Sequence, residues 1–493
     1  MIPANSVIYQ IVIDRYDNDD GTLHREISAP DYNGRFDKYL GGTFNGIRRH
    51  MNHIENLGVS HVLLSPVNES KEYHAYHPTD NLLVNHRFGS EEDLRKLIED
   101  FHRRNIKVML DYVSTHVSSS HELFQRKSRS QNPEDREWFL FTNEIESHPI
   151  YRPYFDELAY KMTSGHPEKI REANLHEYLS YFGLVDCPLL NLENPEVKEW
   201  HKRNLDYWIE NFGFDDVRFD SGFIQPKLLA SEISQYLKKH GDINLITENW
   251  DFENSEQDCF GLCDGEFDIS PTLLFNRFSE SSTEPEREEF FKKIIGYYHR
   301  NKHKPSVGYS PIVSLDNHDL PRFSGSKNLQ KILATLQFSL LSVPLIYYGN
   351  EIGMKQYNDG SDRVAQSRDP MRFDLWDGET VDFYKNLIKF RRDFFTPETK
   401  LGEFLINDHG SLFSCAGYNG DQSFYVILNL EDRDKPVILN QLFRGEGVNA
   451  IGRELIQEIG QTDPSTFLVK GNSSYILRLK NNLSANNDIS PVG

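Results

Sequence analysis

Four short apolar runs in this chain each end in an acid. KVMLD ends at Asp111, DDVRFD at Asp220 and NLITE at Glu248, and IVSLDNHD carries Asp316 and Asp319. Parallel strands of a barrel all end on one face, so acids from separate strands meet there. The pattern therefore predicts an active site built from carboxylates.

Strand-like and helix-like segments alternate along most of the chain, as parallel βα units require. We predict strands over 6–14, 61–64, 216–219, 244–247, 313–315 and 345–348, and helices over 44–57, 91–104, 195–212 and 381–392. Polar residues interrupt the apolar run 332–348, which therefore predicts a buried helix followed by a strand and not a membrane span. A barrel of eight units is the simplest fold with this order.

Two stretches depart from the alternation. Residues 117–186 are polar, aromatic and too long for a simple connection, so we predict an inserted subdomain beside the acidic face. Short alternating segments over 397–482 predict a C-terminal antiparallel β-sandwich, followed by a flexible tail over 483–493. The predicted fold class is α/β, with a (β/α)8 TIM barrel formed by 1–116 and 187–396.

The balance of charge limits the partners. The chain has 54 Lys and Arg against 75 Asp and Glu, a net charge of −21, which repels phosphate backbones and anionic lipids. We expect neither nucleic acid nor membrane as a partner. The start lacks a basic region followed by a long apolar one, so we predict no signal peptide and a cytoplasmic location.

The four cysteines form no dense framework. Cys259 and Cys263 could bind a metal or form a bridge, but no further thiol or nearby His completes a site. We favour free or partly buried thiols, which are typical of a reducing cytosol.

Several ordered motifs resemble those of the α-amylase superfamily of retaining glycoside hydrolases. LGVSHVLLSPV is similar to the second-strand motif, and the segment from YHAYHPTDN to KVMLDYVSTH is similar to the one from the substrate-stacking Tyr to the third strand. FDDVRFD, LITENW and SLDNHD are similar to the strands of the nucleophile, the acid/base and the third carboxylate. VPLIYYGNEIG is similar to the last strand. The resemblance extends from the first strand to about Arg392.

The resemblance implies a role for each acid. Retaining cleavage of a glycosidic bond needs an ionised carboxylate that attacks the anomeric carbon and a protonated carboxyl that protonates the departing oxygen, about 5–5.5 Å apart. Asp220 is then the nucleophile and Glu248 the acid/base, with a raised pKa. Asp319 is expected to bind sugar hydroxyls and stabilise the oxocarbenium-like state. Arg218 should keep Asp220 ionised, and Asp111 should support Arg218 from behind.

The other candidates are predicted to contact the sugar. The resemblance implies that Tyr76 stacks on the ring and that His116 and His318 donate hydrogen bonds. Trp250 lies just past the acid/base and either lines the cleft or covers the barrel rim. Arg322 is either a substrate-side residue or part of a structural salt bridge.

No cofactor is predicted to be required. Relatives with calcium between barrel and insert have Asn where this chain has Thr115 and His where it has Ile224, which argues against that site. A second family calcium loop resembles DRYDNDDG, with Asn18 and Asp20 as candidate ligands. Because Thr43 stands where that loop usually has Asp, a solvated acidic turn is the alternative.

The resemblance indicates a class of substrate but not the exact preference within it. SRDPMRFDLWDG resembles a loop of oligo-α-glucosidases and cyclomaltodextrinases, whereas His77 replaces an Asp that is common in exo-glucosidases. The fifth motif is altered to Cys187-Pro188-Leu189-Leu190-Asn191, which leaves the preference unresolved. We predict hydrolysis of α-1,4 linkages in maltooligosaccharides, with α-1,6 cleavage, exo or endo action and the oligomeric state left open.

Two alternatives use the same barrel. A transglycosidase, a sucrose or glucoside phosphorylase, or an isomerase would pass the same glycosyl-enzyme intermediate to an acceptor other than water. A catalytically inactive carbohydrate-binding protein is the second alternative, although the chain retains Asp220, Glu248 and Asp319.

Overall fold

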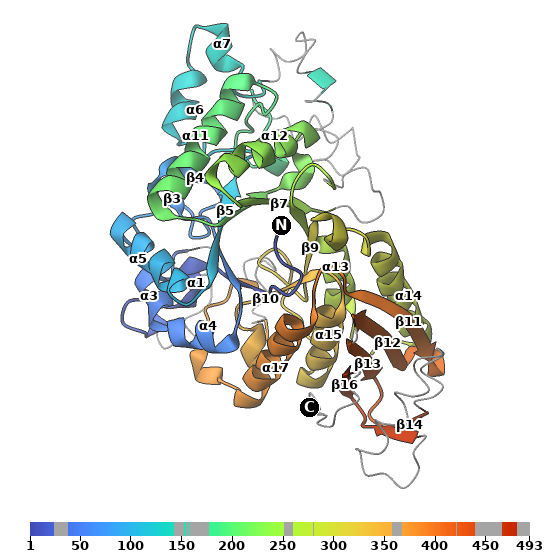
Figure 1. Ribbon diagram of the computed structural model, residues 1–493. Coiled ribbons are helices and arrows are strands. Elements are labelled where there is room, and N and C mark those ends of the chain that lie inside the picture. Colours follow the sequence, from blue (N-terminus) through green and yellow to red (C-terminus); the bar gives the residue numbers. More distant parts are fainter. Residues whose placement is uncertain are drawn as a thin grey trace.

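Eight parallel strands close into a barrel (Figure 1). This computed structural model describes residues 1–23, 38–141, 152–153, 156, 177–250, 260–279, 281–356, 367–420, 422–438 and 466–480. The order around the barrel is β1 (Ile8–Ile11), β10 (Val343–Tyr347), β9 (Ser310–Ser314), β8 (Gly265–Asp268), β7 (Asn244–Asn249), β6 (Asp216–Asp220), β5 (Lys107–Val113) and β2 (His61–Leu64). The predicted (β/α)8 TIM barrel is confirmed.

The barrel strands are buried on both faces, as expected for parallel strands covered by helices. The strand β8 was not among those predicted, because its four residues, GEFD, include two acids. Both acids are buried, and the ammonium of Lys304 lies 2.8 Å from Glu266. A strand with this composition carries too weak a pattern to be recognised from sequence.

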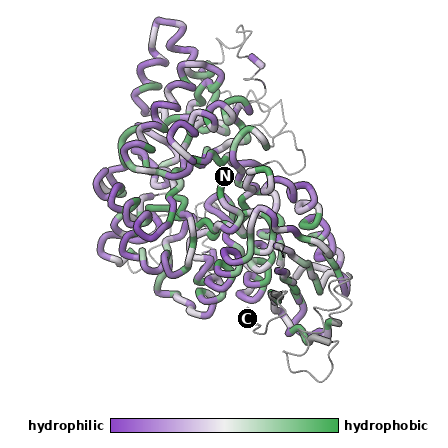
Figure 2. The backbone as a smooth tube through the Cα atoms, in the orientation of Figure 1, coloured by the Kyte–Doolittle hydropathy of each residue, from purple (hydrophilic) through white to green (hydrophobic). Residues whose placement is uncertain are grey.

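Helices cover the outside of the barrel (Figure 1), and their outermost turns are largely hydrophilic (Figure 2). They are α3 (Phe44–Arg49), α4 (Met51–Leu57), α5 (Glu91–His102), α11 (Pro195–Phe212), α12 (Lys227–Leu237), α13 (Ile269–Arg277), α14 (Glu284–Asn301), α15 (Lys327–Ser339) and α17 (Gly378–Phe394). The helix predicted over 44–57 is two helices, because the backbone leaves helical geometry at His50.

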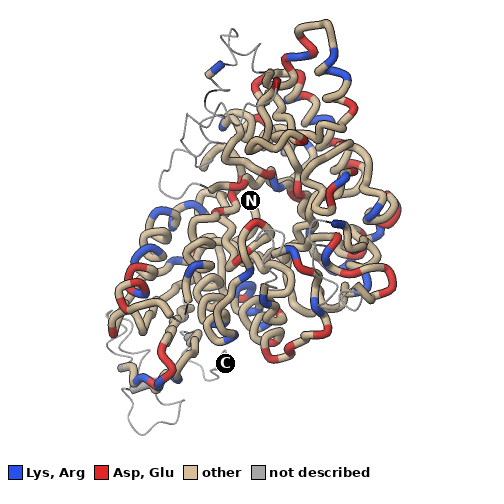
Figure 3. Tube along the Cα trace, turned by 180° about the vertical axis from the view of Figure 1, so that it is seen from behind, with Lys and Arg blue, Asp and Glu red and all other residues tan. Residues whose placement is uncertain are grey.

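α15 and β10 confirm the interpretation of 332–348 as a buried helix followed by a strand. In the part of the chain that the structure describes, no helix is long and apolar enough to cross a membrane. Acidic and basic residues are interspersed along the outer helices (Figure 3).

Short elements stand above the carboxyl ends of β2 and β5. A hairpin of β3 (Asn68–Ser70) and β4 (Pro78–Val84) follows β2, and α6 (Glu122–Lys127) and α7 (Pro133–Arg136) follow β5. Single bridges join His116 to Leu189 and Ser180 to Pro188. Much of the predicted insert lies outside the described residues, so its boundaries stay a prediction.

The C-terminal part is antiparallel, as predicted. β11 (Lys400–Asn407), β12 (Leu412–Asn419), β13 (Gln422–Asn429) and β16 (Ser473–Lys480) form one sheet, and β14 (Lys435–Ile438) pairs with β15 (Thr466–Val469). A small apolar cluster joins the two sheets, which makes a sandwich. The tail predicted over 483–493 lies outside the described residues.

Candidate active site

Arg218 lies at the centre of three acids at the carboxyl ends of β5, β6 and β7. Its side chain is 2% exposed, and its Nη1 lies 2.6 Å from Asp111 Oδ1 and 3.2 Å from Asp220 Oδ1. Its Nη2 lies 3.2 Å from Glu248 Oε2. The parallel register places Asp111 beside Arg218 across β5 and β6. The predicted contacts of Arg218 with Asp220 and Asp111 are therefore present.

Ser221 holds the two carboxyls of Asp220 and Glu248. Its backbone N–H donates to Glu248 Oε2 at 2.8 Å, and its hydroxyl donates to Asp220 Oδ2 at 3.0 Å. The phenolic oxygen of Tyr181 lies 2.8 Å from the same hydroxyl. Ser221 has a φ of 56°, a left-handed conformation that is costly for a residue with a side chain. A Cβ at Gly222 would lie 2.9 Å from the Glu248 nitrogen, so this approach requires glycine there.

Asp319 is held by His318 and Arg368. Its carboxylate lies 3.0 Å from His318 Nε2 and accepts a hydrogen bond from Arg368 Nη2 at 3.0 Å. Arg368 Nε also donates to the His318 carbonyl at 2.8 Å. Burial raises the pKa of Asp319, but the neighbouring His318 ring and the guanidinium groups of Arg368 and Arg218 outweigh it and hold that pKa below its usual value. Asp319 is thus ionised beside the other two acids.

The hydroxyl of Tyr76 connects His318 to Asp111 on β5. Its hydroxyl donates to Asp111 Oδ2 at 2.8 Å and lies 2.6 Å from His318 Nε2. Gln10 Nε2 lies 2.8 Å from His318 Nδ1, and because an amide nitrogen can only donate, the His318 proton is on Nε2. The Tyr76 and His318 rings are nearly parallel, 5.2 Å apart. Tyr76 is thus placed with the candidate residues, as predicted.

His116 lies beside Tyr76 on the same side of the site. It is buried, with Nε2 2.9 Å from the Tyr76 carbonyl and Nδ1 3.0 Å from the Thr115 hydroxyl. Its ring stacks on Tyr181 with centroids 4.6 Å apart. Burial lowers the pKa of His116 to about 3, so the ring is neutral.

The contacts of Trp250 and Arg322 bear on the two alternatives that the sequence left open for each residue. Trp250 Nε1 donates to Glu248 Oε1 at 2.6 Å, a direct contact that the sequence did not reveal. Arg322 is buried, donates to the Tyr348 carbonyl at 2.8 Å and lies 4.5 Å from the Tyr347 ring. Arg322 therefore supports β10, which favours the structural alternative over the substrate-side one.

Sequence reasoning missed Arg368, Ser221 and Tyr181 as site residues. A signal for Arg368 exists, because it lies in the segment SRDPMRFDLWDG, which resembles a family loop. A serine after an aspartate has no distinctive pattern, and the contact of Tyr181 depends on a tertiary fold.

Burial raises the pKa of Asp220 to about 7 and that of Glu248 to about 7. The positive charge of Arg218 acts in the opposite direction on both carboxyls. The raised pKa of Glu248 agrees with expectation, whereas that of Asp220 does not, because Arg218 divides its contacts among three acids. Near neutral pH the two carboxyls titrate as a pair that can hold one proton.

The candidate calcium loop is bound by side chains of α3 and by His50. Asn18 Oδ1 accepts from the Thr22 N–H at 2.8 Å, and Arg49 Nη1 donates to the Asp19 carbonyl at 3.3 Å. His50 Nε2 lies 2.6 Å from Asp17 Oδ2. Positive or hydrogen-bonding groups thus already engage part of the oxygen set that a calcium ion would use.

A parallel barrel with paired acids on adjacent strand ends, and a third acid after β9, defines the site of a retaining glycoside hydrolase. The sequence pattern of the family described as "Alpha amylase, catalytic domain" matches residues 10–389. The chain belongs to the α-amylase family, which confirms the predicted resemblance.

Curated relatives and a solved structure agree with this assignment. "Alpha-amylase 2" of Dictyoglomus thermophilum is 28% identical over 89% of this chain and 72% of its own length. "4-alpha-glucanotransferase" of Thermotoga neapolitana is 30% identical over 65% of this chain and 69% of its own. The cyclic α-maltosyl-(1→6)-maltose hydrolase of Arthrobacter globiformis has the same fold, with a TM-score of 0.72, 20% identity and coverage of 97% and 98%.

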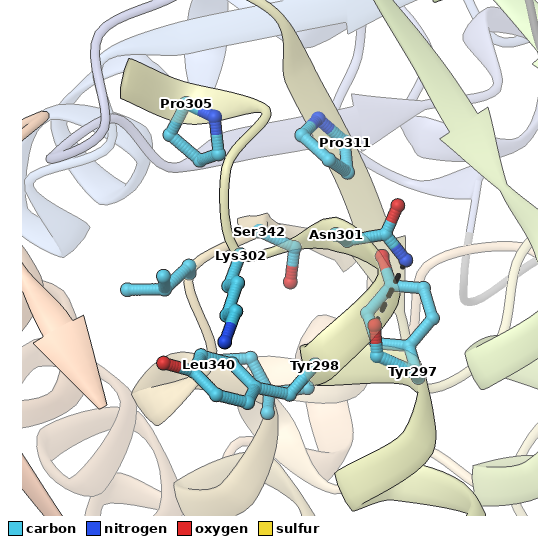
Figure 4. A pocket seen from close by; sticks show the side chains of 9 residues that line it. Tyr297, Tyr298, Asn301, Lys302, Pro305, Pro311, Leu340 and Ser342 are labelled. Carbon is cyan, nitrogen blue, oxygen red and sulfur yellow. Dashed lines mark hydrogen bonds between the residues drawn. The ribbon is translucent and has the colours of Figure 1, made fainter. Parts of the chain in front are cut away.

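A separate, small pocket lies at the opposite end of the barrel. It is lined by Tyr297, Tyr298, Asn301, Lys302, Pro305, Pro311, Leu340, Leu341 and Ser342 (Figure 4). Pro311 and Ser342 lie at the amino ends of β9 and β10, the face of such barrels that serves stability. We therefore assign no catalytic role to it.

Proposed function

We propose that the protein hydrolyses α-1,4 linkages of maltooligosaccharides with retention of anomeric configuration. The main support is the position of Arg218, which contacts Asp220, Glu248 and Asp111 within one buried network. This network fixes the nucleophile and the acid/base relative to each other. The names of the α-amylase and cyclomaltodextrinase relatives support the substrate class.

The reaction follows from the protonation of the acid pair. Ionised Asp220 attacks the anomeric carbon while Glu248 gives its proton to the departing sugar oxygen, which forms a glycosyl-enzyme ester. Glu248, now ionised, takes a proton from water as that water breaks the ester and frees Asp220. Asp319, kept ionised by His318 and Arg368, stabilises the positive charge that develops on the sugar ring.

The contacts around Glu248 suit its two states. The Trp250 and Ser221 N–H groups donate to its two oxygens, so they stabilise the carboxylate that remains after proton transfer. Burial favours the protonated form before that step. Together these effects place the pKa of Glu248 at about 7, which suits a group that first donates a proton and later accepts one.

The test is a time course of maltoheptaose products, with anomers followed by NMR. The α-anomer should appear first, and Glu248→Gln should abolish turnover of maltoheptaose. Glu232→Gln, which removes a half-exposed carboxylate paired with Lys202, is the matched control and should turn over normally. A β-anomer as first product would contradict the double displacement.

Transfer to a sugar acceptor is the second candidate function. The glucanotransferase relative is the specific observation that favours it. Both reactions share the first half, so the same time course separates them. Oligosaccharides longer than maltoheptaose would indicate transfer, whereas only shorter products indicate hydrolysis. Added phosphate should produce no sugar phosphate in either case.

We further propose that catalysis needs no calcium. Arg49 and His50 contact the loop after β1, and buried Ile224 replaces a ligand at the other family site. A chelator should leave kcat/KM and the melting temperature unchanged. A loss of either that added calcium restores would contradict this proposal.

We also propose a cytoplasmic location. Cys187 and Cys415 are free thiols, which suits a reducing compartment. Cys259 lies outside the described residues, so its predicted relation to Cys263 stays untested. Fractionation of the source cells, with an antibody to the protein, would place it directly.

A further inference from the structure

Three metal-ligating side chains meet beside the candidate sugar site. His77, His116 and Cys187 each offer a ligand atom, and these atoms all lie within 4.8 Å of one another. They come from three separate segments: the hairpin before β4, the end of β5 and the altered fifth motif. His77 replaces an Asp that is common in exo-glucosidases, Cys187 begins the altered fifth motif, and the fold brings the two residues together.

Backbone hydrogen bonds fix the three segments relative to one another. The Ser118 N–H donates to the Pro78 carbonyl at 2.8 Å, which ties the segment after His116 to the residue after His77. A bridge between His116 and Leu189 places the fifth motif alongside. The Cys187 carbonyl accepts from the Tyr181 N–H at 2.9 Å. The three ligand segments are therefore held together by backbone hydrogen bonds.

We propose that His77, His116 and Cys187 form a binding site for a zinc ion. Two imidazoles and a thiolate suit zinc, whereas calcium takes oxygen ligands. Three protein ligands leave a fourth tetrahedral position for water. When zinc binds, the Cys187 thiol loses its proton to solvent and the thiolate bonds to the metal.

The hydrogen bonds of His116 fit a metal ligand. With its proton on Nε2, donated to the Tyr76 carbonyl, His116 has a lone pair on Nδ1 that now accepts from the Thr115 hydroxyl. Zinc takes that lone pair, and the Nε2–H bond to a carbonyl orients the ring as second-shell partners of metal-bound histidines do.

His77 is the ligand whose side chain must move for zinc to bind. Tetrahedral zinc, with bonds of about 2.0–2.3 Å, brings its ligand atoms to within about 3.5 Å of one another. His116 and Cys187 are fully buried, whereas His77 is half-buried, and among the described residues its ring nitrogens make no hydrogen bond. Its side chain can therefore turn onto an ion that enters from its exposed side.

Zinc at this site competes with the sugar, a consequence that rests on the proposed function. His116 is itself expected to contact the sugar and lies against the candidate stacking residue Tyr76, so an ion bound to its ring interferes with sugar binding. Zinc should therefore lower the hydrolysis of maltoheptaose, and saturating maltoheptaose should weaken zinc binding. This makes the enzyme sensitive to free zinc.

The direct test is titration of the metal-free full chain with cobalt chloride and zinc chloride, without sugar. We expect one equivalent of cobalt to give a sulfur-to-cobalt charge-transfer band, and zinc to displace it. Cys187→Ala should abolish the band, whereas Cys415→Ala, which removes a buried free thiol of the C-terminal sheet, should retain it. His77→Ala should weaken zinc binding at least about 10-fold, and exposed His86→Ala should not.

Several results would overturn the proposal. A cobalt complex without sulfur charge transfer, or the same zinc affinity in Cys187→Ala and His77→Ala, places the metal elsewhere. A chain that binds zinc as expected but cleaves no maltoheptaose rejects the proposed function and leaves the metal site standing. Zinc inhibition that persists in His77→Ala, relative to the rate of that variant without zinc, rejects the competition between zinc and the sugar.

Discussion

Arg218 and Arg368 both bind acids of the site, but they act on different ones. Arg218 divides its charge among three carboxyls, whereas Arg368 binds only Asp319 among the site acids and fixes the His318 carbonyl as well. Arg368 therefore controls the charge that faces the sugar from the side of β9. It is the residue whose removal should affect Asp319 most directly.

Arg368→Met should lower kcat/KM for maltoheptaose about 10- to 100-fold, because a buried charge-assisted hydrogen bond to Asp319 is lost. The pKa of Asp319 should rise, since Arg368, one of the three groups that lower it, is gone. The matched control is Arg322→Met, which should lower the free energy of unfolding and leave kcat/KM of the folded enzyme near wild type. Wild-type kcat/KM in Arg368→Met would exclude this role.

A second test concerns the hydrogen bond from the Ser221 hydroxyl to Asp220. Ser221→Gly removes the hydrogen bond to Asp220 but keeps the N–H to Glu248 and relieves the left-handed φ. We expect kcat to fall about 10-fold with no loss of thermal stability. Tyr181→Phe, which removes only the hydroxyl behind Ser221, should have a smaller effect. An equal fall in both variants would place the important contact at Tyr181 instead.

The acid pair predicts the pH dependence of the rate. Below the pKa values near 7, both Asp220 and Glu248 become protonated and the nucleophile is lost; above them, both ionise and the acid is lost. The profile of kcat/KM should therefore be a narrow bell centred near neutral pH. The Trp250 N–H lowers the pKa of Glu248, so Trp250→Phe should move the alkaline limb to higher pH. A shift to lower pH would contradict this contact.

At the scale of elements, the sequence predicted those whose pattern is local. Helix α11 begins at Pro195 and ends at Phe212 as expected, since Asn194 caps its start and Gly213 ends it. The strands that carry Asp220 and Glu248 were also found, because apolar runs precede the acids. β8 was not found, since its acids are stabilised by partners that are distant in sequence, such as Lys304.

Arg391 connects elements that are distant in sequence, and no local sequence pattern predicts these contacts. It is fully buried on α17, and it donates to the carbonyls of Ala4 at 2.7 Å and of Phe338 at 3.2 Å and to the Leu340 carbonyl. It thus links the start of the chain to the end of α15. Its guanidinium also lies 3.7 Å from the Phe395 ring.

Arg391→Met should lower the free energy of unfolding by about 3 kcal/mol or more, because buried carbonyls lose their donor. The matched control is Arg392→Met, the next residue, whose side chain is 57% exposed and which should change stability by less than about 0.5 kcal/mol. Urea unfolding measures both. Equal stability of the two variants would show that water replaces the Arg391 contacts.

At the scale of the whole molecule, the barrel and the order of its acids were predictable because the βα rhythm repeats. What the sequence could not show is which residues that are distant in the chain meet in the fold. His77 and Cys187 lie 110 residues apart in the numbering, and only the fold brings their ligand atoms together. Likewise, Arg368 and Asp319 lie on different loops, and only the fold brings them into contact.

The barrel and the C-terminal sheet share one apolar core, although the sequence suggested two separate units. Phe424 on β13 packs against three phenylalanines of α17 and its end, with ring centroids 4.7–5.7 Å apart. Phe413 on β12 stacks on Phe291 of α14 at 4.4 Å. One face of the sheet thus belongs to the core of the barrel, while the other packs on β14 and β15.

The two faces of β13 allow this shared core to be tested with adjacent residues. Side chains alternate along a strand, so Phe424 faces the barrel helices and Tyr425 faces β14 and β15. Phe424→Ala should cost about 3–5 kcal/mol and speed amide exchange in α17 as well as in the sheet. Tyr425→Ala should speed exchange in β14 and β15 while α17 stays protected. If α17 is equally protected in both variants, the sheet stabilises itself alone and the barrel does not depend on it; faster exchange in α17 only with Phe424→Ala means that the two parts unfold together.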